Sequence, residues 1–270
     1  MTDTLGLSTG IAYHHPIEMV LQPIYDSGFR LIEIATARDH IDLLDTRRLR
    51  ELAHVIREMG LTVCSLHAPF GHDIDITDSD PTFRQQSLDH LTRAADALQI
   101  FGGRLYVMHP GGEDHNWVWD RETRIARSAE GLATLWQRCR ERDLDLVIET
   151  PLPHLLGGQP DDLEGLLRLL PHEGTGVCID TSHTSLGGFL FEVMDRFASR
   201  LVHVQASDNR GHTDDHLPPG DGIIDWPKFQ SKLAAIGYQG VFLLELTGNG
   251  DVRDHVAHAA GRARQTLSLA

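Results

Sequence analysis

The sequence predicts a single (β/α)8 TIM-barrel domain spanning residues 1–270, and three observations favour this fold. Short apolar runs alternate with longer amphipathic segments, which is typical of a parallel sheet with helical crossovers. Eight such units of about 30 residues fill the chain, and right-handed crossovers make a closed barrel the simplest way to join them. The first turn, Ser8–Ala12, lacks the G-x-G-x-x-G pattern that the alternative, an open doubly wound sheet, would require.

Each predicted strand is a short apolar, often β-branched run with glycine, proline or polar residues nearby. Because helices cover such a sheet, its parallel strands read as continuous apolar runs. The predicted strands are Leu5–Ser8, Leu31–Ile34, Thr62–Leu66, Leu105–Met108, Leu144–Ile148, Thr175–Ile179, Leu201–Val204 and Val241–Leu244.

The segments between these strands carry helical patterns. The clearest predicted helices are Leu43–Met59, Ser87–Ile100, Thr123–Arg140 and Phe229–Ile236. In the first of them, Asp45 is a candidate N-cap and Gly60 follows as a stop signal. The apolar stripe expected to face the core there consists of Leu44, Leu49, Leu52, Val55 and Ile56.

The composition disfavours nucleic acid as a partner. The formal net charge is −15, from 39 acidic and 24 basic residues. Such a chain repels phosphate backbones unless its basic residues are concentrated locally. The densest basic stretch contains only Arg47, Arg48 and Arg50.

The cysteines and the N-terminus favour a cytoplasmic protein without a membrane segment. Cys64, Cys139 and Cys178 are too few and too scattered for a disulfide framework, and Cys64 and Cys178 lie in apolar runs typical of core thiols. Residues Met1–Thr4 lack the features of a secretory signal. No apolar run approaches the ~20 residues that a membrane span needs. Homo-oligomerisation is left open.

Metal-binding side chains follow six successive predicted strands, and in a barrel these strand ends meet at one mouth. The residues concerned are His67, His109, Glu149, Asp180, Gln205 or His203, and Glu245. One such residue after a strand is usually structural, but six in the same position indicate a site. Converging carboxylates repel one another unless a cation lies between them. Mn²⁺ or Zn²⁺ suits this mixture of oxygen and imidazole ligands best, with Mg²⁺, Co²⁺ or Fe²⁺ as alternatives.

The seventh predicted strand and the loop after it leave two choices open. His203 and Gln205 share one face of the strand, and Gln205 lies nearer its end, although glutamine is the weaker ligand. The polar loop over residues 208–222 is either an acidic surface loop or the segment that brings Asp214 and His216 to His183 near the metal.

Together these segments resemble the xylose isomerase-like TIM barrels, the sugar phosphate isomerase/epimerase superfamily that also includes the apurinic endonuclease branch. The matching motifs are His67–Pro69, His109–Gly111, Glu149–Thr150, Asp180–His183, His203–Gln205, Ser207–Asn209, Asp214–Trp226 and Glu245. The resemblance implies one divalent ion held by Glu149, Asp180, Gln205 and Glu245. Histidine is more usual than glutamine at the third of these positions, and the hydroxypyruvate isomerase-like members share the glutamine.

The endonuclease branch of the superfamily holds three zinc ions with nine ligands. Eight of those positions match this chain, namely His67, His109, Glu149, Asp180, His183, Asp214, His216 and Glu245. The ninth is Gln205 in place of histidine. The resemblance therefore implies His67, His109, His183, Asp214 and His216 as candidates for additional metal ligands.

The resemblance favours a metal-dependent isomerase or epimerase of a sugar, cyclitol or keto acid, with a small sugar-like molecule as its partner. The metal would polarise a carbonyl, and Glu149 and Glu245 would act as base and acid through a cis-enediolate, with His183 as a third catalytic candidate. The candidates for substrate contact are His67, His109, His183, Arg210 and Trp117, and Trp119 and Trp226 either wall the pocket or pack in the core. A dehydratase would use the same proton abstraction.

Two other functions are weighed against this one. A multinuclear zinc phosphodiesterase or apurinic endonuclease is favoured by the extra histidines and opposed by the acidic charge and by Gln205. A sugar-binding barrel without turnover is opposed by the pairing of Glu149 with Glu245.

Overall fold

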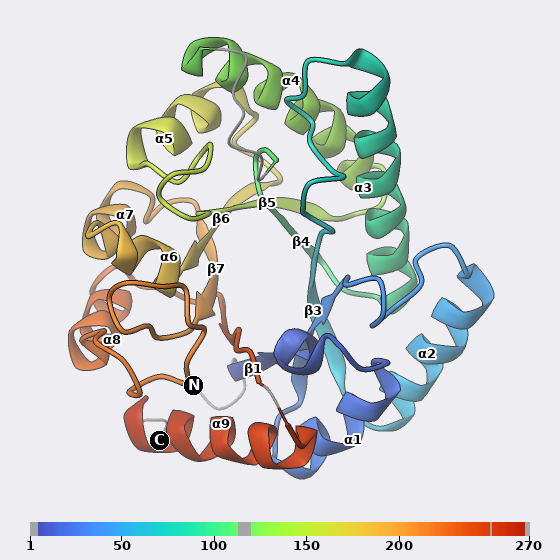
Figure 1. The fold of residues 1–270 in the computed structure, drawn as a ribbon, viewed down its shortest axis with the longest axis vertical. Coiled ribbons are helices and arrows are strands. Elements are labelled where there is room, and N and C mark those ends of the chain that lie inside the picture. The colour runs from blue at the N-terminus through green and yellow to red at the C-terminus, as the bar shows by residue number, and fades with distance from the viewer. Residues whose placement is uncertain (1–4, 113–119, 249, 268–270) are drawn as a thin grey trace.

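The computed structural model describes residues 5–112, 120–248 and 250–267, and within them the strands form a closed parallel barrel (Figure 1). Each strand pairs with the next in chain order, and β8 pairs with β1. The prediction of a (β/α)8 TIM barrel is confirmed. The strands are β1 (Leu5–Ser8), β2 (Leu31–Ala35), β3 (Thr62–His67), β4 (Leu105–Met108), β5 (Asp145–Glu149), β6 (Thr175–Asp180), β7 (Leu201–Ala206) and β8 (Val241–Leu244).

The helices surround the barrel, and α9 lies beside α1, so that the end of the chain closes the outer ring (Figure 1). The helices are η2 (Thr9–Ala12), α1 (Glu18–Asp26), α2 (Thr46–Glu58), α3 (Pro81–Phe101), α4 (Arg121–Arg140), α5 (Pro160–Leu169), α6 (Thr181–Leu186), α7 (Leu190–Arg196), α8 (Trp226–Ala235) and α9 (Val252–Thr266). None of these helices is long and apolar enough to cross a membrane.

Several strands run one or two residues further than the apolar pattern predicts. β3 includes His67, β5 includes Glu149 and β6 includes Asp180. Backbone pairing continues through these polar residues because it does not depend on the side chain, and Asp180 pairs with Gln205 across β6 and β7. These three candidate ligands are therefore held by the sheet itself.

The predicted start of the helix at Leu43 is wrong, because α2 begins at Thr46. The side chain of Asp45 accepts a hydrogen bond from the backbone N–H of Arg48 and caps the helix there. Leu44 consequently lies outside the helix and is 69% exposed, and Val55 is 45% exposed. The prediction that both belong to the buried stripe is wrong, whereas Leu49, Leu52 and Ile56 are buried as predicted.

Aspartate caps also explain why three other helices begin earlier than predicted. Asp80, Asp120 and Asp225 each accept a hydrogen bond from a backbone N–H in the first turn of α3, α4 and α8. The amphipathic stripe starts later than the cap, so periodicity alone misses the first turn.

The main apolar core lies between the barrel and the helices, and a smaller cluster of Val107, Val147 and Cys178 lies inside the barrel. Cys178 is a buried thiol as predicted, and Cys64 is half-buried with its thiol donating to the carbonyl of Ile32. All three cysteines are free.

Candidate metal centre

Carboxylates and imidazoles from distant parts of the chain meet at the C-terminal mouth of the barrel. Their ligand atoms form four groups, each within 4.8 Å: His67, His109 and Glu149; Glu149, Asp180 and His183; Asp180, His216 and Glu245; His183, Asp214 and His216. Asp180 belongs to one group with Glu149 and to another with Glu245. Asp180 at the end of β6 therefore links Glu149 of β5 with Glu245, which directly follows β8.

Glu149 is buried at the end of β5 and faces two histidines, one at the end of β3 and one directly after β4. Its Oε2 lies 2.7 Å from Nε2 of His67, and its Oε1 lies 3.2 Å from Nε2 of His109. Burial disfavours the ionised carboxyl, but the charges of His109 and His67 together hold the pKa of Glu149 well below its usual value. Glu149 is therefore ionised at neutral pH.

The imidazoles of His67, His183 and His216 are oriented in the same way. Nδ1 of each faces a backbone carbonyl, and Nε2 of each faces a carboxylate of Glu149 or Asp214. A carbonyl on one ring nitrogen fixes the tautomer and aims the other nitrogen, an arrangement typical of histidines that bind metals. The accepting carbonyls are those of Ala68, Thr150 and Glu245, at 2.8, 3.0 and 3.1 Å.

Asp214 lies between two of these histidines. Its Oδ2 is 3.0 Å from Nε2 of His183 and 2.9 Å from Nε2 of His216, and its Oδ1 accepts a hydrogen bond from the hydroxyl of Ser182. His216 adopts a positive φ of 45°, which is uncommon for a residue other than glycine. Of the two alternatives for the loop over residues 208–222, the structure shows the one that brings Asp214 and His216 to His183.

A buried aspartate, Asp208, holds this loop in shape. Its carboxylate accepts hydrogen bonds from the backbone N–H groups of Asn209, Gly220 and Ile224 and from the indole of Trp226. Trp226 is itself buried, so of its two predicted positions it takes the one in the core.

The residues present fit a divalent cation. Oδ1 of Asp180 accepts from the backbone N–H of His183, but Oδ2 is buried and has no hydrogen-bond partner among the described residues. Burial, followed by the negative charge of Glu149, raises the pKa of Glu245 well above its usual value. A cation between these carboxylates would supply the missing partner and offset their repulsion, and the mixture of donors suits Mn²⁺ or Zn²⁺.

The barrel interior below the mouth contains a polar cluster that the sequence did not indicate. Glu33 is fully buried on β2, where its Oε2 accepts from the hydroxyl of Ser65 and lies 3.3 Å from Nε2 of His203. Nε2 of Gln205 donates to Glu33, and Oε1 of Gln205 accepts from the thiol of Cys178 at 3.0 Å. Of the two strand-seven residues, His203 therefore lies beside Glu33 inside the barrel, and Gln205 as a metal ligand stays a prediction.

Only some of the predicted substrate-binding residues lie in the site. His67 and His109 lie in the site, whereas Arg210 is largely exposed and paired with Asp215 at 3.5 Å. Trp117 and Trp119 lie outside the described residues.

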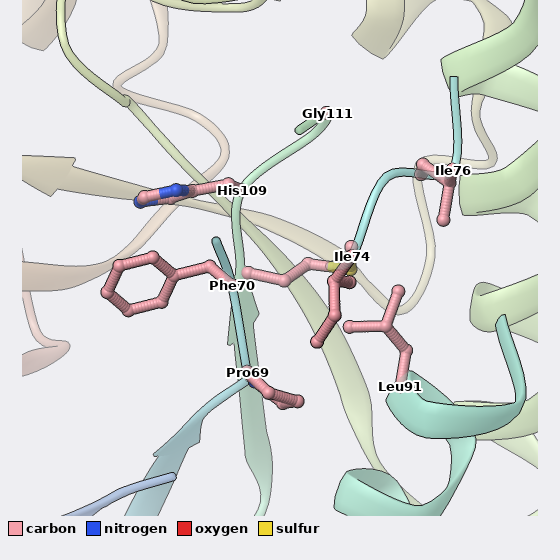
Figure 2. Close-up of a pocket in the computed structure, with 8 residues that line it drawn as sticks. Pro69, Phe70, Ile74, Ile76, Leu91, His109 and Gly111 are labelled. Carbon is pink, nitrogen blue, oxygen red and sulfur yellow. The ribbon is translucent and has the colours of Figure 1, made fainter. Parts of the chain in front are cut away.

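Phe70 is a site residue that the sequence did not single out. Its ring centroid lies 5.1 Å from that of His67 and 5.1 Å from that of His109. Figure 2 shows its side chain extending in the same direction as His109, away from Ile74 and Leu91, which line a small apolar pocket behind it. Phe70 is 55% exposed, and an aromatic side chain directly after His67–Pro69 was the signal available in the sequence.

Metal binding is expected to release about one proton near pH 7.5 for each imidazole that becomes a ligand, because metals bind deprotonated imidazole. Burial disfavours the imidazolium cation, but Glu149 beside His67 and Asp214 beside His216 raise the pKa of each histidine to about 10. Protons therefore compete with the metal below that pH, and Zn²⁺ affinity should rise as the pH is raised through neutrality. Calorimetric Zn²⁺ titration of metal-free protein, in buffers with different ionisation enthalpies, measures the proton count.

A suitable control for this measurement is His54→Gln, which replaces an exposed histidine of α2 and should leave the proton count unchanged. An affinity for Zn²⁺ that does not vary with pH would contradict the prediction.

Comparison with known proteins agrees with this geometry. A family model described as the xylose isomerase-like TIM barrel matches residues 21–268. The chain belongs to this family. Among its relatives, fructoselysine 3-epimerase of Escherichia coli O157:H7 is 22% identical, over 86% of this chain and 86% of its own length. A probable endonuclease 4 of Mycobacterium bovis BCG is 24% identical, over 75% of this chain and 65% of its own length.

Solved structures of other proteins share this fold over nearly the whole chain. A D-tagatose 3-epimerase-like protein superimposes with a TM-score of 0.86 at 20% identity, covering 98% of this chain and 97% of the other. The IolI protein, solved with a binding zinc atom, superimposes with a TM-score of 0.83 at 15% identity, covering 98% of each chain. The protein is thus a sugar epimerase-like TIM barrel with a candidate buried metal site.

Proposed function

We propose that this protein is a divalent-metal-dependent isomerase or epimerase that moves a proton beside the carbonyl group of a sugar, cyclitol or keto acid. The observation that carries the proposal is geometric: the carboxyls of Glu149 and Glu245 each lie in a ligand group with Asp180 at the mouth of the barrel. Such a pair can supply a base and an acid in one site. The relatives named as 3-epimerases support a sugar-like substrate.

The roles of the residues follow from their charge states and positions. Glu149, ionised beside its two histidines, would take the proton from the substrate carbon, and Glu245 would return one. His183 would donate to a substrate oxygen. A divalent ion held by Glu149, Asp180, Gln205 and Glu245 would polarise the carbonyl and make the neighbouring C–H more acidic.

The test of this proposal is exchange of substrate C–H with solvent deuterium. Metal-free protein and protein reconstituted with Mn²⁺ or Zn²⁺ are incubated in D₂O with a panel of ketoses, cyclitols and keto acids, and proton NMR follows the carbon next to each carbonyl. Exchange is expected only with metal. If the metal-loaded protein exchanged no substrate in the panel, the proposal would be wrong. Exchange would instead exclude the hypothesis that the barrel binds sugars without turnover.

A specific observation also supports a second candidate, a multinuclear zinc phosphodiesterase. The group of His67, His109 and Glu149 shares no residue with the group of His183, Asp214 and His216, so the two groups have the ligands for separate ions. The relative named as a probable endonuclease 4 belongs with this alternative.

Metal stoichiometry separates the two candidates. The isomerase proposal predicts about one tightly bound ion per chain, whereas the phosphodiesterase predicts about three zinc ions. Elemental analysis after gel filtration gives the count, and hydrolysis of bis(4-nitrophenyl) phosphate gives the activity. Three zinc ions together with hydrolysis, and no deuterium exchange, would replace the first proposal by the second.

A further inference from the structure

A wide cleft leads outward from the candidate metal centre. It has a volume of about 900 Å³ and is lined at its inner end by His67, His216 and Glu245. Ligand sites of about 300–1,000 Å³ accommodate drug-sized molecules, so this cleft is near the upper end of that range. A free monosaccharide is much smaller than such a molecule and would fill only the inner part.

The wall of this cleft is apolar beyond the metal-binding residues. Tyr13, Leu44 and Phe70 line it, and they are three of the seven large hydrophobic side chains that are exposed on the described residues. Leu44 is 69% exposed and lies in the short segment before α2. The sequence pattern predicted it to be buried in the apolar stripe of that helix. Large exposed apolar side chains gathered in one cleft mark a ligand site, because their contact with water is unfavourable.

A free sugar is a poor match for this wall. Its hydroxyl groups surround the whole molecule, and each loses hydrogen bonds to water when it is placed against leucine or phenylalanine. Arg38, Asp73 and Arg93 also line the cleft, and Asp73 pairs with Arg38 at 3.3 Å.

We propose that the substrate is a conjugate, in which a sugar-like head carries an apolar substituent that lies along Tyr13, Leu44 and Phe70. The proposal rests on the proposed function for the position of the head at the metal-binding residues. The continuity of the cleft with His67 and Glu245 favours a substrate over a second copy of the chain as its occupant.

The test compares fructose with two conjugates, N-fructosyl-glycine and N-fructosyl-phenylalanine, which share one 1-amino-1-deoxyfructose head and differ only by a benzyl group. Binding to the metal-reconstituted protein is measured by calorimetry at several temperatures. We expect fructosyl-phenylalanine to bind at least about tenfold more tightly than fructosyl-glycine, because the benzyl group is removed from water. Its binding should also show the more negative heat capacity change.

Matched variants assign this preference to the cleft. Leu44→Ser is expected to reduce the ratio of the two affinities about threefold or more. Leu169→Ser, which changes an exposed leucine of α5 outside the cleft, should leave the ratio unchanged. Tyr13→Ser is a second variant in the cleft, and it should lower the ratio as well.

The outcomes separate this inference from the function on which it rests. A ratio near one, or a ratio that neither Leu44→Ser nor Tyr13→Ser lowers, overturns the conjugate. Concentration-dependent dimerisation that Leu44→Ser abolishes would also overturn it, with a second copy as the occupant. Deuterium exchange with fructose would then still support the proposed function, whereas a cleft-dependent preference without exchange on any ligand would sink that function alone.

Discussion

Replacing Glu245 by glutamine is expected to slow metal-dependent deuterium exchange about 10²- to 10⁴-fold, the usual contribution of a positioned acid or base. Glutamine keeps the size of the side chain and one carbonyl oxygen but has no carboxyl proton to exchange with the substrate. In the metal-free protein, burial and the charge of Glu149 raise the pKa of Glu245 well above its usual value, and its carboxyl lies in one ligand group with Asp180 and His216. Initial rates from proton NMR measure the effect.

Metal content distinguishes a lost proton donor from a lost ligand. Elemental analysis of Glu245→Gln should still find metal, because Asp180, Glu149 and the histidines remain in place. Glu149→Gln should lose both exchange and much of the metal, because Glu149 belongs to two ligand groups. The control is Glu51→Gln, an exposed residue of α2. A fully loaded Glu245→Gln protein that exchanges at the wild-type rate would remove Glu245 from the mechanism.

Replacing Asp208 by alanine is expected to lower the free energy of unfolding by about 3 kcal/mol or more. The carboxylate is fully buried, and its loss leaves three backbone N–H groups and the indole of Trp226 without their acceptor. The same loop carries Asp214 and His216, so Zn²⁺ affinity should fall along with stability. Urea unfolding of the metal-free protein and calorimetric Zn²⁺ titration measure the two effects.

Two variants of the same loop provide the comparison. Asp208→Asn keeps one acceptor oxygen and should be intermediate in stability. Asp221→Ala removes a partly exposed aspartate that pairs with Arg262 and His258, and it should cost at most about 1 kcal/mol. If Asp208→Ala were no less stable than Asp221→Ala, Asp208 would not be what holds the loop.

The sequence alone predicted the barrel and the residues gathered at its mouth. Apolar runs ending in Glu149 and Asp180 identify strands, and a closed parallel barrel places all strand ends on one rim whatever the details of packing. Hydrophobic periodicity predicted the first residues of helices less well. In α2, for example, the Asp45 cap starts the helix at Thr46 and leaves Leu44 outside it.

Only the tertiary structure decided which side chains meet across the barrel and along its loops. Glu33 accepts a hydrogen bond from Gln205, and Asp208 accepts one from Gly220 in the loop that carries His216. Leu44 lines the same cleft as Phe70. These contacts join segments far apart in the chain, and no local pattern encodes them. Their positions follow from strand register, from the barrel's curvature and from loop conformations that depend on buried hydrogen bonds.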